Sequence, residues 1–123
     1  MSNNKLVRDN IPQIMAKNGQ KAVIRILNDA EYSVELEKKL DEEVREFHED
    51  KKLEELADIL EVVYALCEAQ GHTAAELQAV YDKKHSERGG FAEKLFLIDV
   101  TQPFHEDQSI DVITKKNHKE HSK

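Results

Sequence analysis

Apolar residues recur every three or four positions through the middle of the chain, and this spacing is typical of amphipathic α-helices. Four of them, at spacings of 4, 4 and 3, are Leu36, Leu40, Val44 and Phe47. They predict a helix over about residues 30–49, with Asn28 or Asp29 as its N-cap. A more apolar helix is predicted over about residues 52–70, closed by Gly71 in a left-handed conformation.

Shorter cap and stop signals predict two further helices. Asn10 or Asp9 can cap a helix that ends at Gly19. Thr73 and Glu76 form a capping box, which begins a helix that the glycines at 89 and 90 should end. Residues 23–27 lean toward β structure, and the apolar residues 91–100 are expected to form either a terminal strand or an extended arm. The predicted fold class is therefore all-α, a helical bundle built around a helical hairpin.

Composition agrees with a small helical protein. The 123 residues suit one domain, and four Gly, two Pro and no Trp argue against a turn-rich β-sandwich. Charged residues make up 35% of the chain and the mean hydropathy is −0.69. The core must therefore be built from amphipathic elements whose outer faces are exposed to solvent. We expect one domain over residues 1–114 and a disordered tail over residues 115–123, where there is nothing apolar to bury.

The charge distribution restricts the class of partner. The net charge is −7, and residues 31–61 carry 13 acidic and 5 basic side chains. Proteins bind the phosphate backbone of nucleic acid through clustered Lys and Arg. An acidic chain of this kind is therefore not expected to bind nucleic acid. No apolar run approaches the length of about 20 residues that a membrane helix needs. With Cys67 as the single cysteine, a reducing, cytoplasmic setting is expected.

Two pairs of carboxylates occur at helical spacing on the two central helices. Glu43 and Glu46 form one i, i+3 pair, and Glu55 and Asp58 form the other. On antiparallel helices joined by a short turn, the four could face one point. Repulsion would make such a cluster costly without a cation, and these hard oxygen ligands suit Mg²⁺ or Mn²⁺. A solvated acidic surface is the alternative that the pattern leaves open.

The places of these acids on their helices bear on that choice. At about 100° per residue, Glu43 lies on the shoulder of the apolar stripe rather than on the outer face. Asp58 lies in a segment that is apolar nearly all round. A carboxylate there is expensive unless it is paired, hydrogen-bonded or bound to a metal. Arg45 and several lysines could instead supply the pairing.

Three segments together resemble a known family. Glu42-Glu43-x-x-Glu46 followed by Glu55-x-x-Asp58 resembles the EExxE…ExxD metal signature of the MazG-like all-α nucleotide pyrophosphohydrolases, which include phosphoribosyl-ATP pyrophosphohydrolase. The segments at residues 5–12 and 83–91 resemble the KLVRDKIP opening and K…RGGF ending of a small predicted house-cleaning branch. The gap between Glu46 and Glu55 is eight residues, shorter than in many members, so the hairpin should turn tightly around residues 48–51.

The resemblance implies a reaction and a set of site residues. Family members cleave nucleoside triphosphates between the α and β phosphates, giving the monophosphate and pyrophosphate, and commonly form homodimers or homotetramers. Carried over by motif, Mg²⁺ (or Mn²⁺) would be held by Glu43, Glu46, Glu55 and Asp58. Glu42 would be an accessory acid, either orienting a ligand or serving as the base for the attacking water. The phosphate groups that the metal does not contact would be bound by Arg8, Lys5, Lys83 and Arg88.

Two other hypotheses remain open at this point. One is a different reaction of the same superfamily, the hydrolysis of phosphoribosyl-ATP. The other is a helical interaction module without catalysis, whose acidic face binds a basic partner. That module would show no dependence on magnesium and no change in melting temperature with the metal.

Overall fold

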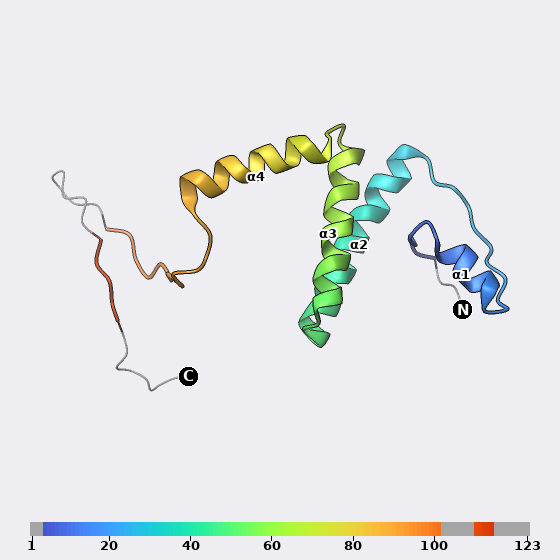
Figure 1. Ribbon diagram of the computed structural model, residues 1–123, viewed down its shortest axis with the longest axis horizontal. Helices are drawn as coiled ribbons and strands as arrows, with labels where there is room; N and C mark the ends of the chain where they lie inside the picture. Colours follow the sequence, from blue (N-terminus) through green and yellow to red (C-terminus); the bar gives the residue numbers. More distant parts are fainter. Residues whose placement is uncertain (1–3, 102–109, 115–123) are drawn as a thin grey trace. The chain divides into compact units, whose positions relative to one another are not determined.

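The computed structural model describes residues 4–101 and 110–114 of the chain. Four helices follow one another in sequence (Figure 1): α1 (Ile11–Lys17), α2 (Asp29–Asp50), α3 (Leu53–Ala69) and α4 (Ala74–Arg88). Neither described range contains a strand, so the all-α prediction is confirmed. None of these helices is long and apolar enough to cross a membrane.

Contacts along the backbone divide the chain into two units, Met1–Gly89 and Gly90–Lys123, and all four helices belong to the first. The prediction of one domain over residues 1–114 stays a prediction. The expected tail at residues 115–123 lies outside the described residues.

The helical hairpin formed by α2 and α3 is the centre of the first unit. These two helices pack against each other extensively, whereas α3 makes a smaller contact with α4. Only three of the described residues are buried: Leu36 (2% exposed), Val62 (6%) and Glu43 (6%). The core is therefore a narrow seam between α2 and α3, and one of its three members is a carboxylic acid.

The seam runs through Glu43 rather than through its apolar neighbour. Leu36 and Glu43 are seven residues apart, which is two helical turns with a drift of only about 20°. Val44 instead lies at the margin of the stripe and is 36% exposed. Glu43, rather than Val44, is therefore the buried residue at this point of α2.

A two-residue turn joins the helices of the hairpin. Lys51 adopts a left-handed conformation (φ 57°), which ends α2, and Lys52 is the N-cap of α3. The backbone N–H of Lys51 donates to the carbonyl oxygen of Phe47 (2.8 Å), and its Nζ donates to that of His48 (2.7 Å). These bonds satisfy carbonyls that the helix end would leave unpaired. The turn lies later than the predicted residues 48–51, because α2 continues through Asp50.

Capping boxes begin α2 and α4. The Asn28 side chain accepts from the backbone N–H of Glu31 (2.8 Å), and the Glu31 carboxylate accepts from the N–H of Asn28 (3.2 Å). Thr73 and Glu76 make the same reciprocal pair at the start of α4. Both predicted helix starts are confirmed, and so is the left-handed conformation of Gly71 after α3 (φ 89°).

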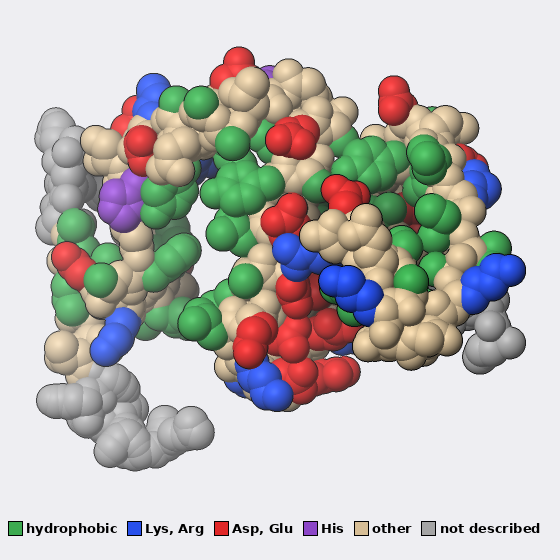
Figure 2. Space-filling model, turned by 45° about the vertical axis from the view of Figure 1, so that its right-hand side comes forward, with side chains coloured by type: hydrophobic (Ala, Val, Ile, Leu, Met, Phe, Trp, Pro, Cys, Tyr) green, Lys and Arg blue, Asp and Glu red, His purple; other side chains and the backbone are tan. Residues whose placement is uncertain are grey.

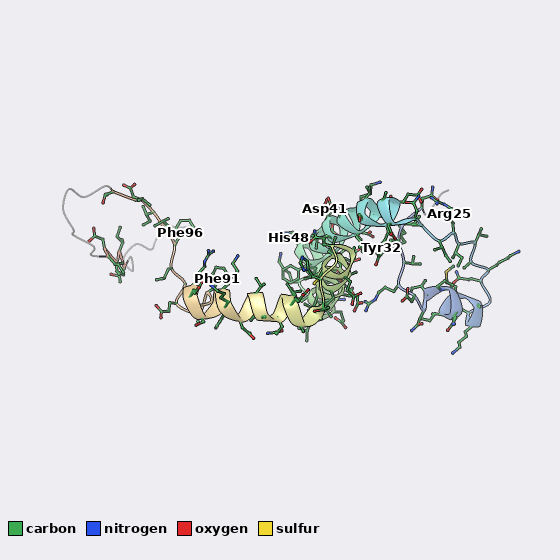
Figure 3. All side chains as sticks on the ribbon, turned by 90° about the horizontal axis from the view of Figure 1, so that it is seen from above. Arg25, Tyr32, Asp41, His48, Phe91 and Phe96 are labelled. Atoms are coloured by element: carbon green, nitrogen blue, oxygen red, sulfur yellow. The ribbon has the colours of Figure 1, made fainter. Side chains whose placement is uncertain are left out.

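The two segments that lean toward β structure form no strand. Residues 23–27 lie in the connection between α1 and α2, where Arg25 is labelled in Figure 3. Arg25 forms an ion pair with Glu31 (3.0 Å). After α4, a turn at residues 91–94 leads into irregular chain, with Phe91 and Phe96 almost fully exposed (Figure 3). A strand needs a hydrogen-bonded neighbour, and neither segment has one among the described residues. The alternative of a terminal strand at residues 91–100 is therefore wrong.

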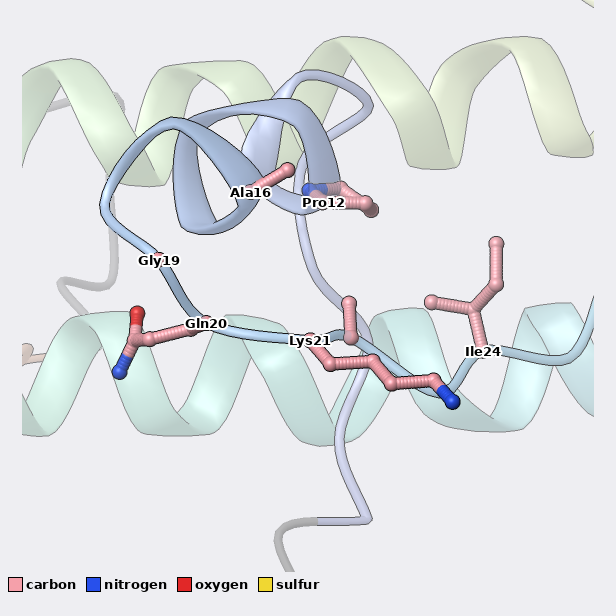
Figure 4. Close-up of a pocket in the computed structure, with 7 residues that line it drawn as sticks. Pro12, Ala16, Gly19, Gln20, Lys21 and Ile24 are labelled. Atoms are coloured by element: carbon pink, nitrogen blue, oxygen red, sulfur yellow. The ribbon is translucent and has the colours of Figure 1, made fainter.

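The short helix α1 folds back on the connection that follows it. Pro12 and Ala16 of α1 face Ile24 across an open hollow of about 530 Å³ (Figure 4). Its remaining lining residues are Gly19, Gln20, Lys21 and Ala22. No acid, histidine or cysteine lines this hollow, and Lys21 is its one charged lining residue.

The N-cap of α2 supplies the first test. Asn28→Ala leaves the N–H of Glu31 without its acceptor, and should lower the free energy of unfolding by about 1 kcal/mol. Asn28→Gly should lower it by only a few tenths of a kcal/mol, because glycine is also favourable at the N-cap. Urea unfolding followed by circular dichroism measures both, and equal losses for the two variants would contradict the assigned cap.

Candidate metal centre

Five carboxylates gather on the hairpin near its turn, in two overlapping groups. One group is Glu42, Glu43 and Glu46, all from α2, and the other is Glu43 of α2 with Glu55 and Asp58 of α3. Within each group one oxygen of every carboxylate lies within 4.8 Å of the others. Figure 2 shows acidic side chains gathered in this way with basic side chains beside them. We call these five residues the carboxylate cluster.

Glu43 is the member that joins the two groups, and it is the buried one. Its Oε2 lies 3.4 Å from the Nζ of Lys39, while its Oε1 is buried and has no hydrogen-bond partner. Burial, together with the nearby charge of Glu46, raises the pKa of Glu43 above its ordinary value of 4.5, although Lys39 opposes the shift. A buried carboxylate oxygen without a hydrogen-bond partner destabilises the folded state. A bound cation or a proton on this carboxylate would remove that cost.

Lys39 is the basic residue that the cluster holds most firmly. One turn before the acids on α2, its Nζ lies 3.4 Å from Glu42 and 3.4 Å from Glu43, and its side chain is only 16% exposed. The i, i+3 and i, i+4 spacings bring these three side chains together on one helix. Lys39 therefore offsets part of the negative charge on the α2 side.

At the start of α3, Glu55 lies close to other carboxylates on both sides of the turn. Glu55 and Asp58 are half-buried. Partial burial, followed by the neighbouring carboxylate of Asp50, raises the pKa of Glu55 above 4.5, and Glu46 and Asp58 add to this. Asp50 is the last residue of α2 and Glu55 lies in the first turn of α3, so the two-residue turn sets their proximity.

Arg8 reaches the cluster from the segment before α1. Its Nη1 donates to Oδ1 of Asp58 at 2.9 Å, and its Nη2 lies 3.5 Å from Oε1 of Glu61. Glu61 thus pairs with a base instead of joining either carboxylate group. Arg8 is the one predicted phosphate-binding residue that the structure brings to the carboxylate cluster.

The other predicted phosphate-binding residues are not joined to it. Lys83 forms an ion pair with Glu87 on the same helix, α4. Lys5 and Arg88 are exposed, and no ion pair of theirs occurs within the described ranges. Their roles, and those of the five acids as ligands or base, stay predictions.

Sequence reasoning missed two residues of the centre, Lys39 and Asp50, and did not identify Arg8 as the partner of Glu61. Lys39 could have been found, because its i, i+3 and i, i+4 spacing to Glu42 and Glu43 is a standard helix pairing. Asp50 and the pairing of Arg8 with Glu61 depend on where the turn falls and on how the N-terminal segment lies against α3. Neither is a local property of the sequence.

The residues present suit a hard divalent cation. All candidate ligands are carboxylate oxygens, the donor type that Mg²⁺ and Mn²⁺ take. Glu43 also presents a buried, unpaired oxygen. Ordinary solvated helix acids keep water on both oxygens, so an acidic surface alone does not account for this atom.

Comparison with known proteins gives little further information. No protein-family model matches the sequence, and no solved structure matches the chain. A stretch of 41 residues is 54% identical to an uncharacterized protein of Mycolicibacterium smegmatis. The match covers 33% of this chain and 42% of that protein, so the chain spans less than half of its relative. The similarity thus carries no activity with it.

Glu43→Gln tests whether the buried acid destabilises the metal-free hairpin. Removal of the charge should raise the melting temperature in chelator by about 4 °C, the shift that ~1 kcal/mol gives in a domain of this size. If the cluster holds a metal, Mg²⁺ should raise the melting temperature of the wild type and should not raise that of this variant. Asp41→Asn, at an exposed position on α2 (Figure 3), is the matched control and should keep the wild-type response.

The pKa shifts predict how stability depends on pH without metal. The raised pKa values of Glu43 and Glu55 mean that the folded state binds these protons more tightly than the unfolded chain. Stability should therefore rise as the pH falls from neutrality through the raised values toward 4.5. Below that, Glu31 and Glu76, whose capping interactions lower their pKa values, should lose those interactions on protonation, and stability should fall.

Melting temperatures in chelator between about pH 3 and pH 8 check this curve. Glu43→Gln should reduce the slope of stability against pH above pH 4.5 to the part that Glu55 contributes, and should leave the slope below pH 4.5 unchanged. A wild type whose stability falls steadily from neutral pH downward would contradict the assignment.

Proposed function

We propose that the protein is a metal-dependent nucleotide pyrophosphohydrolase. It would hydrolyse a nucleoside triphosphate, or a related nucleotide, between the α and β phosphates to the monophosphate and pyrophosphate. The clearing of non-standard nucleotides would fit such a reaction. The proposal joins the resemblance of three sequence segments to the MazG-like family with the placement of the carboxylates on the hairpin.

One observation carries the proposal most. Glu43 is 6% exposed, has an unpaired buried oxygen, and belongs to carboxylate groups on both sides of the hairpin. Placing an acid without a counter-ion in a seam where two other described residues are buried costs stability. A cation bound there would offset this cost.

The chain's residues have defined tasks in this reaction. Glu43, Glu46, Glu55 and Asp58 would hold Mg²⁺ or Mn²⁺. When bound, the ion supplies positive charge to the triphosphate and polarises a phosphoryl oxygen. Glu42 is half-buried, and its Oε1 lies 3.4 Å from the Nζ of Lys39, an ion pair that orients the carboxylate.

Glu42 is then suited to serve as the base. It takes a proton from the attacking water, whose oxygen bonds to phosphorus. The anhydride bond between the α and β phosphates breaks, and pyrophosphate leaves with the bonding electron pair. Arg8 supplies two parallel N–H donors to phosphate oxygens. Positioning and charge account for most of the catalysis that such a site needs.

Assembly into a homodimer or homotetramer is part of the proposal. Four apolar side chains at spacings of 3, 4 and 4 are exposed along one face of α3: Leu53, Leu56, Leu60 and Tyr64. A helix with apolar residues at this spacing buries them against another element. A second copy would cover this face and would help to enclose a nucleotide, which the hairpin alone cannot surround.

Pyrophosphate release from a panel of substrates tests the reaction. The panel holds standard and modified nucleoside triphosphates and phosphoribosyl-ATP, each with Mg²⁺ or with chelator. Metal-dependent release by the wild type is expected, with a loss of at least a hundredfold in Glu43→Gln, since the variant removes the central ligand. Asp41→Asn should retain wild-type rates.

The panel also separates the competing hypotheses. Release from phosphoribosyl-ATP alone would assign the related reaction of histidine synthesis. No release from any substrate, together with no thermal shift on addition of Mg²⁺, would contradict the proposal and favour a helical interaction module.

A further inference from the structure

Arg8 pairs with two carboxylates of α3 that differ in their surroundings. Asp58 and Glu61 are three residues apart on α3, so one guanidinium can span both. The contacts are 2.9 Å to Asp58 and 3.5 Å to Glu61. Asp58 belongs to the carboxylate group with Glu43 and Glu55, whereas Glu61 lies in neither group found in the described part of the chain.

The Arg8 pairing is open to exchange. The side chains of Arg8, Asp58 and Glu61 are 55%, 37% and 57% exposed. Water competes for such ion pairs, which contribute little net stability. Lys39, by contrast, is mostly buried against Glu42 and Glu43. Arg8 is therefore the cation of the centre that can leave its carboxylate most easily.

We propose that Arg8 is an exchangeable cation at Asp58 and that Glu61 is the positioning residue that retains it. This inference rests on the proposed function. In the metal-free protein Arg8 neutralises Asp58. A divalent cation at Asp58 repels the guanidinium, which then stays with Glu61 alone. Glu61 occupies at most two of its five N–H donors, and the others face a phosphate oxygen of the incoming nucleotide.

This exchange predicts shifts of opposite sign for two ligands. Arg8→Gln removes the competitor at Asp58, so Mn²⁺ alone should bind about threefold more tightly, as expected for an exposed ion pair. The same variant removes a charged donor, so inorganic triphosphate in excess Mn²⁺ should bind about tenfold more weakly. An Arg8 that merely anchors the N-terminal segment would not strengthen the binding of either ligand.

The variant Glu61→Gln tests whether Glu61 holds Arg8 in place, separately from the competition of Arg8 with the metal at Asp58. Without Glu61, Arg8 pairs with Asp58 alone, so Mn²⁺ should bind about twofold more weakly and triphosphate about threefold more weakly. The double variant Arg8→Gln/Glu61→Gln should bind triphosphate no worse than Arg8→Gln, because Glu61 acts only through Arg8.

Isothermal titration calorimetry on the full chain measures these constants, first with MnCl₂ alone and then with inorganic triphosphate at saturating Mn²⁺. Arg45→Gln is the matched control. It removes the same charge from an exposed residue of α2 beside Glu46, and no ion pair of Arg45 occurs within the described ranges. Changes below twofold in both constants are expected for this variant.

Three results would overturn the inference. If Arg8→Gln weakens both ligands, Arg8 is a structural anchor. If it leaves Mn²⁺ binding unchanged while the wild type binds Mn²⁺ and releases pyrophosphate, the exchange is absent and the proposed function stands. If the wild type does not bind Mn²⁺ at all, the proposed function and the exchange both fail.

Discussion

The seam between α2 and α3 is the interaction on which the rest of the described structure depends. It holds Leu36, Val62 and Glu43, and no other described residue is buried. In so small a core a single acid is a large fraction of the total, and the usual hydrophobic driving force is correspondingly weak. The hairpin therefore changes along its length, from apolar packing around Leu36 to charge held in partial burial near the turn.

Much of this arrangement follows from local sequence. The cap at Asn28, the capping box at Thr73 and the left-handed Gly71 each depend on a few neighbouring residues, so their helix boundaries could be predicted closely. The inward place of Glu43 also follows from the sequence, because Glu43 lies on the shoulder of the apolar stripe and seven positions after Leu36, which returns it to the same face. Val44, its apolar neighbour, is the more exposed of the two. Spacing, rather than residue type, decides which side chain faces the partner helix.

What could not be predicted depends on contacts between distant residues. Arg8 meets Asp58 fifty positions later in the chain, and no local pattern specifies that pairing. The segments around residues 23–27 and 91–100 have residues suited to strands, but a strand forms only where a second one lies beside it. The two basic residues of the centre also differ for this reason. Lys39 is fixed by its own helix, whereas Arg8 depends on how the N-terminal segment lies against α3.

The turn at Lys51 and Lys52 limits how the length of this protein can vary. One residue added within α2 between Glu43 and the turn would rotate the end of that helix by about 100°, which would carry the start of α3, with Glu55 and Asp58, away from Glu43. Insertions that preserve the cluster must lengthen α2 and α3 together by matching numbers of turns. Substitutions on the outer faces of the hairpin are free of this constraint. Length and composition are therefore subject to different evolutionary limits in the same two helices.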